Sequence, residues 1–551
     1  MIERNGCDEI ANQILVKNNN VFERNIMSVQ QFEKNKIAAP FLGEPLIHIV
    51  GQDPLGLLNT GGKTFDLVLP GLNNVTDRIR YYSFYCWFFY CYAKYIGKPS
   101  KKEQFNYLRR AEFILSLLAA KTGVQGIGGI TKALEIYNTS QNEFDLTIGT
   151  GEEKKVKDGT YWKNPRGIFG QNYVSSLKQI HLITEFDTTS ECFVRTEFEI
   201  ENRVSGYQLA LAFEENLNDD IALLFNEIMK RGAITQSEIE RLVEPFNMLK
   251  IPIGTKEHEL IWKLLTGNDE PKIENSNFFR KRTIQLVLEK VKNNDEPFFD
   301  YRLTFDAYHS KGIINNKIDE TYSLWYFYQL EQFWHMACTG SLSIFLKTLN
   351  IESKGNWIEE EKLIDKIAEE VAEFLKNESY IDEIETFQKL KIIDLLEEEV
   401  VDTIKRTNIN SEKIAYNILL IKKLIINNSS EIERLLSLTK KYELNSNSSF
   451  LSSIVALQSK EELSINDFVK YFIKKYVIVR HQWVSLKKMN NSQSTEKFIR
   501  EDSLIRYIDD VEYAYSSPRL NTLVDFLRDM QLITEDKKEL TKVGENLFNS
   551  L

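Results

Sequence analysis

Apolar side chains recur every three or four residues through long stretches of the chain. This spacing places them on one face of an α-helix. It holds from Ile364 to Leu375, continues from Ile414 to Leu438, and returns from Leu520 to Leu527. The pattern predicts a mainly α-helical protein.

Two more helices are predicted nearer the N-terminus. The aromatic stretch Tyr81–Tyr95 follows Asn73–Asp77, which supplies residues suited to an N-cap. The apolar part of this stretch is shorter than the roughly 20 residues that a membrane span needs, so we expect a buried helix. A second helix is expected from Lys101 to Lys121, and the run Gly123–Gly129 ends it.

A predicted order of helix, hairpin and helix occupies residues 165–216. Gly170–Ile180 has a helical pattern, and an alternating hairpin follows that ends in Phe193–Ile200. Another helix is expected from Gly206.

The same order returns at the C-terminus. Ser517–Met530 has a proline in its first turn and helical apolar spacing. Gln531–Thr541 is typical of a two-stranded wing that turns at Asp536 and Lys537, and a closing helix is expected from Gly544.

The C-terminal segment resembles the winged-helix family, in which a helix, Leu-Ile, a short wing and Leu-Thr-x-x-Gly follow one another. These positions are Leu532, Ile533, Leu540, Thr541 and Gly544. The resemblance implies that the first helix enters a DNA major groove and that wing cations contact phosphates. The fold class that we predict is a mainly α, multidomain helical protein with winged-helix-like α+β segments near residues 165–216 and 500–551.

The length of 551 residues corresponds to three or four domains at about 100–200 residues each. The box Thr235–Glu238 predicts a helix start. We expect an N-terminal helical domain, a winged-helix-like segment, a helical middle, an acidic helical region, and a basic helix with the C-terminal winged helix. Their predicted bounds are 1–160, 161–235, 236–350, 351–444 and 450–551.

Composition indicates a globular protein of a reducing compartment. Apolar residues make up 42% and charged residues 27% of the chain. The five cysteines form no C-x-x-C pair, and the first residues lack an apolar signal sequence. We expect a cytoplasmic protein with no membrane partner.

Charge is distributed unevenly along the chain. The formal net charge is −11, and residues 351–402 contain 17 acidic and 6 basic side chains, which gives 6 − 17 = −11. Residues 470–500 contain eight basic side chains against Glu496 alone. A local basic stretch matters more for contact with phosphate than the negative net charge of the whole chain does.

The basic stretch and the C-terminal segment supply the predicted DNA-binding residues. Lys470, Lys474 and His481 are expected on one side of a helix from about Asn466 to Met489. Asp525 and Asp529 on the presumed recognition helix would repel phosphate, so a protein-binding role stays open. The predicted DNA-binding residues are Lys470, Lys474, Lys475, Arg519, Arg528, Lys537 and Lys538.

Two glycine-rich runs partly resemble phosphate-binding loops. Gly61–Thr64 resembles the end of a P-loop, but Leu57 stands where the first glycine is required. We also expect Phe65–Pro70 not to form the helix that this motif needs. Gly123–Gly129 follows a helix rather than a strand, so it does not fit a dinucleotide loop.

His309-Ser-Lys311 fits the His-x-Lys core of phospholipase-D-type nucleases. The resemblance implies that the histidine attacks phosphorus and the lysine steadies the oxyanion. Asn316 stands where that family has aspartate, and no second copy is present.

Two other groupings contain ligand-type residues. Glu331 and His335 lie four apart on a predicted helix and share a face, but core packing beside Trp334 is the favoured interpretation. Asp145 and Glu153 loosely match a metal-dependent nuclease, although a turn is expected between them. We predict no catalytic residue, metal or cofactor.

The layout of the whole chain is similar to the kleisin-type partners of condensin-like (SMC-like) ATPases, and the composition is typical of a low-GC bacterium. We predict a non-enzymatic DNA-binding or adaptor subunit of a bacterial DNA-processing or anti-phage defence complex. Its expected partners are duplex DNA and protein subunits such as an ATPase or nuclease. The alternative is a nuclease with a degenerate phosphodiesterase site, and a third possibility is that the winged helices hold only protein partners.

Overall fold

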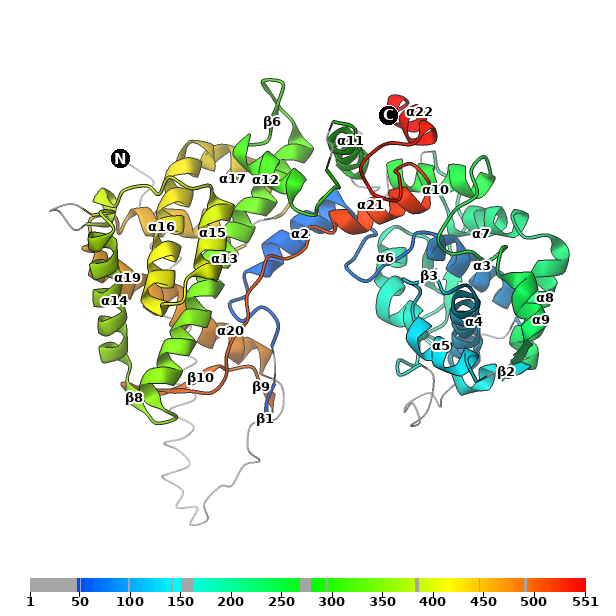
Figure 1. The fold of residues 1–551 in the computed structure, drawn as a ribbon, viewed down its shortest axis with the longest axis horizontal. Coiled ribbons are helices and arrows are strands. Elements are labelled where there is room, and N and C mark those ends of the chain that lie inside the picture. The colour runs from blue at the N-terminus through cyan, green and yellow to red at the C-terminus, as the bar shows by residue number, and fades with distance from the viewer. Residues whose placement is uncertain are drawn as a thin grey trace, which may run out of the picture. The chain divides into compact units, whose positions relative to one another are not determined.

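The computed structural model is mainly α-helical, as predicted (Figure 1). The chain divides into two compact units, one formed by residues 1–52 and 485–496 and the other by residues 53–484 and 497–551. The residues that the structure describes are 47–49, 51–97, 100–139, 142–149, 162–201, 203–267, 279–293, 296–381, 386–444, 446–489 and 493–551.

In the smaller unit, β1 (Ile47–His48) pairs in parallel with β9 (Gln493–Ser494). All the other elements belong to the larger unit, apart from α20 (Arg480–Lys488), whose residues fall in both. The five-part division expected from the sequence stays a prediction.

The long helix α13 (Glu320–Ser353) forms the centre of one core. Most of its residues are buried, including Trp325, Phe333 and Trp334. Because apolar and aromatic side chains surround this helix on every side, it is covered by several other helices. Those that pack on it include α2 (Leu58–Val68), α12 (Arg302–His309) and α16 (Asn410–Asn428).

The acidic region folds as amphipathic helices on the same core. α14 (Glu360–Asn377) buries Leu363, Ile364, Ile367 and Val371 against α16 and α19 (Ile465–Phe472). Its acidic face stays in solvent, because the apolar residues recur at helical spacing. The neighbouring helices are α15 (Glu397–Arg406), α17 (Ile432–Lys441) and α18 (Phe450–Gln458).

The aromatic stretch is the buried helix α3 (Arg80–Tyr95), as predicted. It packs on α7 (Gly206–Glu215), and Trp87 contacts the rings of Phe213 and Phe225. Its N-cap is Ile79, which provides no side-chain cap, so the predicted capping by 73–77 is wrong. The Asn73 carboxamide instead accepts from Val75 N, because an asparagine readily closes its own turn. No helix among the described residues is long and apolar enough to cross a membrane.

Glycine and capping residues predict one end each of two further helices. α4 (Lys101–Thr122) ends at Gly123, whose φ of 68° suits a residue without a Cβ. α9 (Gln236–Leu242) starts at the capping box of Thr235 and Glu238. The remaining helices are α5 (Ile130–Tyr137), α8 (Asp219–Arg231), α10 (Lys256–Thr266) and α11 (Phe279–Lys292), of which α11 contacts α2 and α13.

The described strands are short. β10 (Phe498–Glu501), β11 (Leu504–Tyr507) and β8 (Ile358–Glu359) form an antiparallel sheet in that order. Two other antiparallel pairs join β2 (Glu143–Asp145) to β5 (Ala233–Thr235) and β6 (Ile313–Ile314) to β7 (Lys317–Ile318).

The predicted order of helix, hairpin and helix is present in residues 165–216. π-helical turns at Phe169–Tyr173 lead into α6 (Val174–Gln179), and β3 (Ile183–Glu185) pairs with β4 (Phe193–Arg195) before α7. His181 ends the helix with a φ of 58°, and Leu182 N donates to Leu177 O.

The C-terminal segment has the same local geometry. Gln531 has a φ of 59°, Leu532 N donates to Leu527 O, and the helices are α21 (Leu520–Asp529) and α22 (Lys542–Asn549). Its wing is smaller than predicted and is reduced to one bridge between Ile533 and Leu540. The two segments therefore share a local fold, while the winged-helix relationship itself stays a prediction.

Candidate functional site

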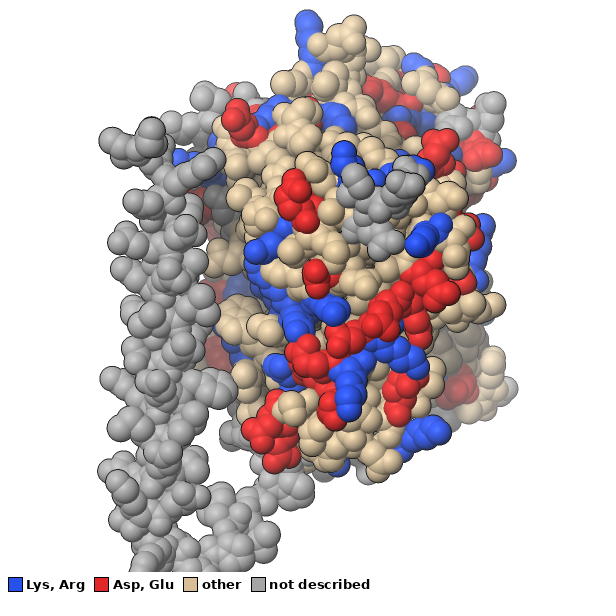
Figure 2. Space-filling model, turned by 90° about the vertical axis from the view of Figure 1, so that its left-hand side faces the viewer, with Lys and Arg blue, Asp and Glu red and all other residues tan. Residues whose placement is uncertain are grey.

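The predicted DNA-binding lysines Lys470 and Lys474 lie against the acidic helix α14. Lys470 Nζ is 2.7 Å from Asp365, and Lys474 Nζ is 2.7 Å from Glu361. Lys475 Nζ donates to Tyr471 Oη at 2.9 Å. On the face drawn in Figure 2, blue and red side chains lie next to one another. Much of the positive charge of this stretch is thus balanced within the chain.

His481 does not share a face with these lysines. Its side chain is buried, its Nδ1 lies 3.0 Å from Pro54 O, and its Nε2 accepts from Lys497 N. The helix is π-helical from Ile473 to Val479, so residues beyond this part no longer follow the spacing of an α-helix. The prediction of a common face was wrong for this reason.

Three of the four predicted cations of the C-terminal segment are also engaged. Arg519 Nη1 donates to Leu72 O at 2.8 Å, and its guanidinium lies 3.8 Å from the ring centroid of Phe65. Arg528 and Lys537 both contact Asp525, at 2.9 and 3.0 Å. Lys538 forms no ion pair with a described residue.

Helix α21 packs on residues 71–82, the segment that leads into α3. Asp529 is only 1% exposed, and its carboxylate lies 2.8 Å from Arg78 Nη1. Burial raises the pKa of Asp529 to about 7, and the nearby Arg78 only partly offsets this. Tyr82 meets Phe526 edge to face at a centroid distance of 5.6 Å.

The corresponding helix of the first segment holds the same stretch. Asn73 Nδ2 donates to Asn172 O at 2.8 Å and to Ser176 Oγ at 2.9 Å. Gly71 N donates to Gln179 Oε1 at 2.9 Å. The two helices that a winged helix would present to DNA are therefore both bonded to residues 71–82.

The predicted pair His309 and Lys311 is not aimed at one point. His309 Nε2 lies 2.9 and 3.0 Å from the two oxygens of Glu398. Lys311, with a φ of 56°, turns away and donates to Asn427 O at 2.8 Å. Hydrogen bonding to Glu398 raises the pKa of His309, whereas burial lowers that of Lys311.

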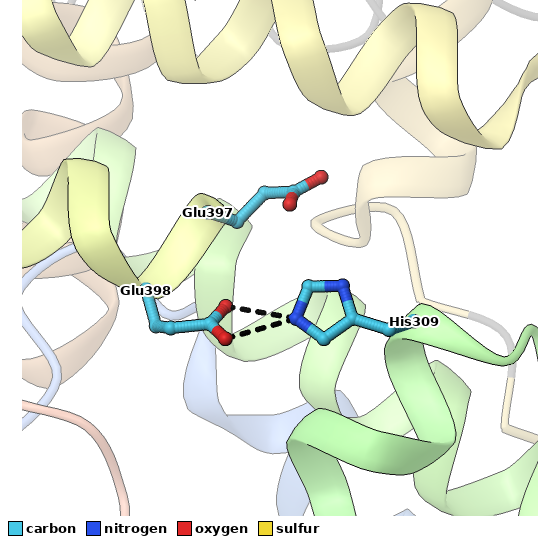
Figure 3. A group of neighbouring side chains, drawn as sticks. All are labelled: His309, Glu397 and Glu398. Carbon is cyan, nitrogen blue, oxygen red and sulfur yellow. Dashed lines mark hydrogen bonds and ion pairs between the residues drawn. The ribbon is translucent and has the colours of Figure 1, made fainter. Parts of the chain in front are cut away.

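The structure brings His309 together with two carboxylates that the sequence analysis did not single out. One ligand atom from each of His309, Glu397 and Glu398 lies within 4.8 Å of the others (Figure 3). Glu397 is buried and accepts from Tyr308 Oη at 2.7 Å and from Asn427 Nδ2 at 2.9 Å. An imidazole and two carboxylates are a donor set that could hold zinc or manganese.

A cavity of about 560 Å³ borders this cluster, and His309, Glu398, Arg302 and Asp306 contribute to its lining. The triple glutamate at residues 397–399 is visible in the sequence at the start of α15. Acidic residues are common in a first helical turn, because they suit the positive end of the helix dipole. His309, which completes the ligand cluster with Glu397 and Glu398, lies on α12, far away in sequence.

Glu331 and His335 lie in the core of α13, as the favoured interpretation expected. Glu331 accepts from Phe450 N at 2.9 Å, and burial raises its pKa to about 8. Burial lowers the pKa of His335 to about 4. Both side chains are therefore neutral near pH 7, and they belong to no ligand group among the described residues.

The other candidate motifs fall in places that do not favour catalysis. Gly61–Thr64 lies inside α2, so the expectation that Phe65–Pro70 is not helical was wrong for residues up to Val68. A glycine pair in the middle of a helix forms no phosphate loop. Asp145 accepts from Thr147 N at the end of β2, and Glu153 lies outside the described residues.

Comparison of the chain with protein-family models, with curated proteins and with solved structures found no match.

Proposed function

We propose that this protein is a non-enzymatic adaptor subunit that works through protein contacts in a multi-protein complex. The observation that carries the proposal is the packing of α6 and α21 on residues 71–82. These helices are held on the chain's own residues 71–82 by side-chain and backbone hydrogen bonds. The same surfaces would have to be freed before either helix entered a DNA groove.

The charges of the predicted DNA-binding set support the same proposal. Lys470, Lys474, Arg528 and Lys537 each lie within an ion pair of this chain. A phosphate would have to displace a carboxylate at each of these positions, which weakens the gain from releasing counterions. A complex with an ATPase or nuclease subunit, in DNA processing or anti-phage defence, is the setting that we propose for the adaptor.

Coexpression with the products of neighbouring genes tests this proposal. We expect a stoichiometric complex in size-exclusion chromatography with light scattering, and weak binding of the isolated chain to a fluorescent duplex at 150 mM salt, an ionic strength near physiological. A structured chain that forms no complex with any of these products would contradict the adaptor role.

Charge reversal separates DNA binding from protein binding. Lys475→Glu and Lys538→Glu are the clean variants, because neither lysine forms an ion pair with a described residue. Lys317→Glu, at an exposed position in β7, is the matched control. Tight, salt-sensitive duplex binding that is lost in the first two variants and kept in the control would favour a DNA-binding subunit instead.

One observation favours the alternative of a nuclease, namely the grouping of His309, Glu397 and Glu398 beside a cavity. Cleavage of single- or double-stranded DNA in manganese that disappears in His309→Ala would support this alternative. We expect no cleavage by the purified chain.

A further inference from the structure

A second cavity, of about 370 Å³, lies between the start of α4 and residues 164–170. Among the described residues, its lining includes four basic side chains and two carboxamides, and no aspartate or glutamate. These residues are Lys101, Lys102, Arg109, Arg166, Asn106 and Asn164. Such a concentration of positive charge is unexpected in a chain whose net charge is −11.

Described carboxylates balance part of this positive charge. Lys101 is paired with Glu191, which also lies 4.0 Å from Arg166. Lys102 forms no ion pair with a described residue. Low-dielectric walls strengthen the field of such a cluster inside a concave site, so an anion is attracted there.

The basic groups are held in place by the fold. Arg166 lies over the rings of Phe105 and Phe193, at 5.5 and 5.8 Å from their centroids. A Cβ on Gly170 would lie 2.2 Å from Arg166 Cβ, so the absence of a side chain there lets Arg166 keep this position.

Arg109 forms an inner wall of the same cavity. It is only 2% exposed, and it donates to Phe105 O at 3.2 Å and to Asn106 Oδ1 at 2.6 Å. These hydrogen bonds orient the guanidinium.

We propose that this cavity binds a small phosphorylated molecule, of the class of nucleotides or sugar phosphates. Its volume lies in the range of roughly 300–1,000 Å³ that is usual for small-molecule sites. Lys101, Lys102 and Arg166 would contact the phosphate, and Asn106 and Asn164 offer hydrogen bonds to the rest of the ligand. The proposal goes beyond the adaptor function and is independent of it.

The test measures thermal unfolding and calorimetric binding of the full chain with inorganic phosphate, pyrophosphate, ATP and adenosine. We expect a saturable rise in the unfolding temperature with at least one of the three phosphate probes, and none with adenosine. A ligand that binds only the folded state must raise this temperature. No saturable rise with any phosphate probe, or equal binding of adenosine, would overturn the proposal.

Three variants locate the site. Lys102→Gln and Arg166→Gln remove one charge each, and we expect each to weaken binding at least tenfold. Gly170→Ala removes no charge but forces Arg166 to move, and it should weaken binding similarly. Lys121→Gln removes a lysine at the far end of the same helix and should leave binding unchanged.

Unchanged binding in all three cavity variants, or an equal loss in Lys121→Gln, would overturn the assignment. A duplex oligonucleotide that binds more tightly than the small probes, with the same dependence on Lys102, would also overturn it, because the surface would then be a nucleic-acid site. Circular dichroism of each variant checks that it is folded.

Discussion

Glu331 is 2% exposed inside α13, and among the described residues only Phe450 N donates a hydrogen bond to its carboxyl group. The second carboxyl oxygen has no partner among the described residues. A charged form would be poorly solvated there, which is why its pKa is raised to about 8. The apolar residues around Glu331 in the sequence predict that it is buried. They do not predict how many hydrogen bonds its carboxyl group receives, because this depends on how α18 packs near α13.

We therefore expect Glu331→Gln to change the pH dependence of stability. In the unfolded chain this carboxyl ionises from about pH 4.5, while the folded chain keeps it protonated up to about pH 8. The folded state then binds more protons, so the free energy of unfolding of the wild type falls as pH rises between these values. Each pKa unit corresponds to about 1.4 kcal/mol.

Urea unfolding at pH 5, 6, 7, 8 and 9 checks this expectation. Glu331→Gln should be close to the wild type at pH 5 and increasingly more stable up to pH 8. Glu373→Gln, at an exposed position in α14, is the control and should run parallel to the wild type. A parallel curve for Glu331→Gln would contradict a raised pKa.

The His-x-Lys motif shows that the spacing of residues does not predict the direction in which each side chain points. His309 and Lys311 are two positions apart, but Lys311 adopts a left-handed backbone conformation. The turn sends its side chain to α16, while His309 meets α15. A motif of three letters does not specify these backbone angles, so the sequence predicted the residues and missed their directions.

At the scale of elements, two glycines explain why the helix–hairpin–helix segments have one geometry. A Cβ on Gly206 would lie 2.0 Å from Leu182 O, and a Cβ on Gly544 would lie 2.0 Å from Leu532 O. In each segment, the first turn of the closing helix passes close to the backbone of the leucine that follows the first helix. The sequence contains Leu-Ile followed later by glycine in both segments, at Leu182 and Gly206 and at Leu532 and Gly544. Both segments could therefore be predicted from the sequence.

Substitution of these glycines should destabilise the protein. Gly206→Ala and Gly544→Ala force a backbone contact apart, and overpacking of this kind costs about 1–3 kcal/mol. Gly62→Ala is the matched control, because it lies in α2 with nothing within 4 Å of the added Cβ. Alanine in a helix is favoured over glycine, so this control should gain up to about 1 kcal/mol.

The midpoints of urea unfolding compare the stability of the three variants with that of the wild type. Limited proteolysis shows which segment of each variant is exposed first. We expect Gly544→Ala to expose the C-terminal segment to protease first. Equal midpoints for Gly544→Ala and Gly62→Ala would show that the close contact with Leu532 does not matter.

The helix at residues 465–488 shows where the α-helical spacing of residues stops predicting which side chains share a face. Its existence follows from the sequence, but its π-helical turns depend on how Tyr476 and its neighbours pack against α13 and α19. A face predicted across such turns is unreliable, as His481 shows.

At the scale of the whole molecule, residues 71–82 join the two helix–hairpin–helix segments. Local patterns predicted the segments and the aromatic helix, but nothing in them indicates that α6 and α21 share one stretch of chain. The contact from Arg78 to Asp529 links positions 451 residues apart. Long-range pairs of this kind depend on the final packing, so a single sequence does not reveal them.

Substitution of Arg78 should destabilise the protein more than substitution of its partner Asp529. Asp529 is 1% exposed, whereas the side chain of Arg78 is 13% exposed and can reach water. Arg78→Met leaves the buried carboxyl with the more distant Arg528, whose Nη2 is 4.0 Å away. We expect a loss near the lower end of the about 3–5 kcal/mol that is typical of breaking a buried ion pair. Asp529→Asn leaves a guanidinium that solvent can still reach, so we expect it to cost less. The double variant should be more stable than Arg78→Met.

The loss in Arg78→Met should also depend on pH. The pKa of Asp529 is already raised to about 7 by burial, and removal of Arg78 raises it further. At pH 6 the carboxyl can take up a proton and avoid a buried charge that only the more distant Arg528 offsets among the described residues, so the loss should be smaller than at pH 8. Urea unfolding of the wild type, both single variants and the double variant at the two pH values measures this. Equal losses for the two single variants, or no change with pH, would mean that the ion pair does not hold α21 on residues 71–82.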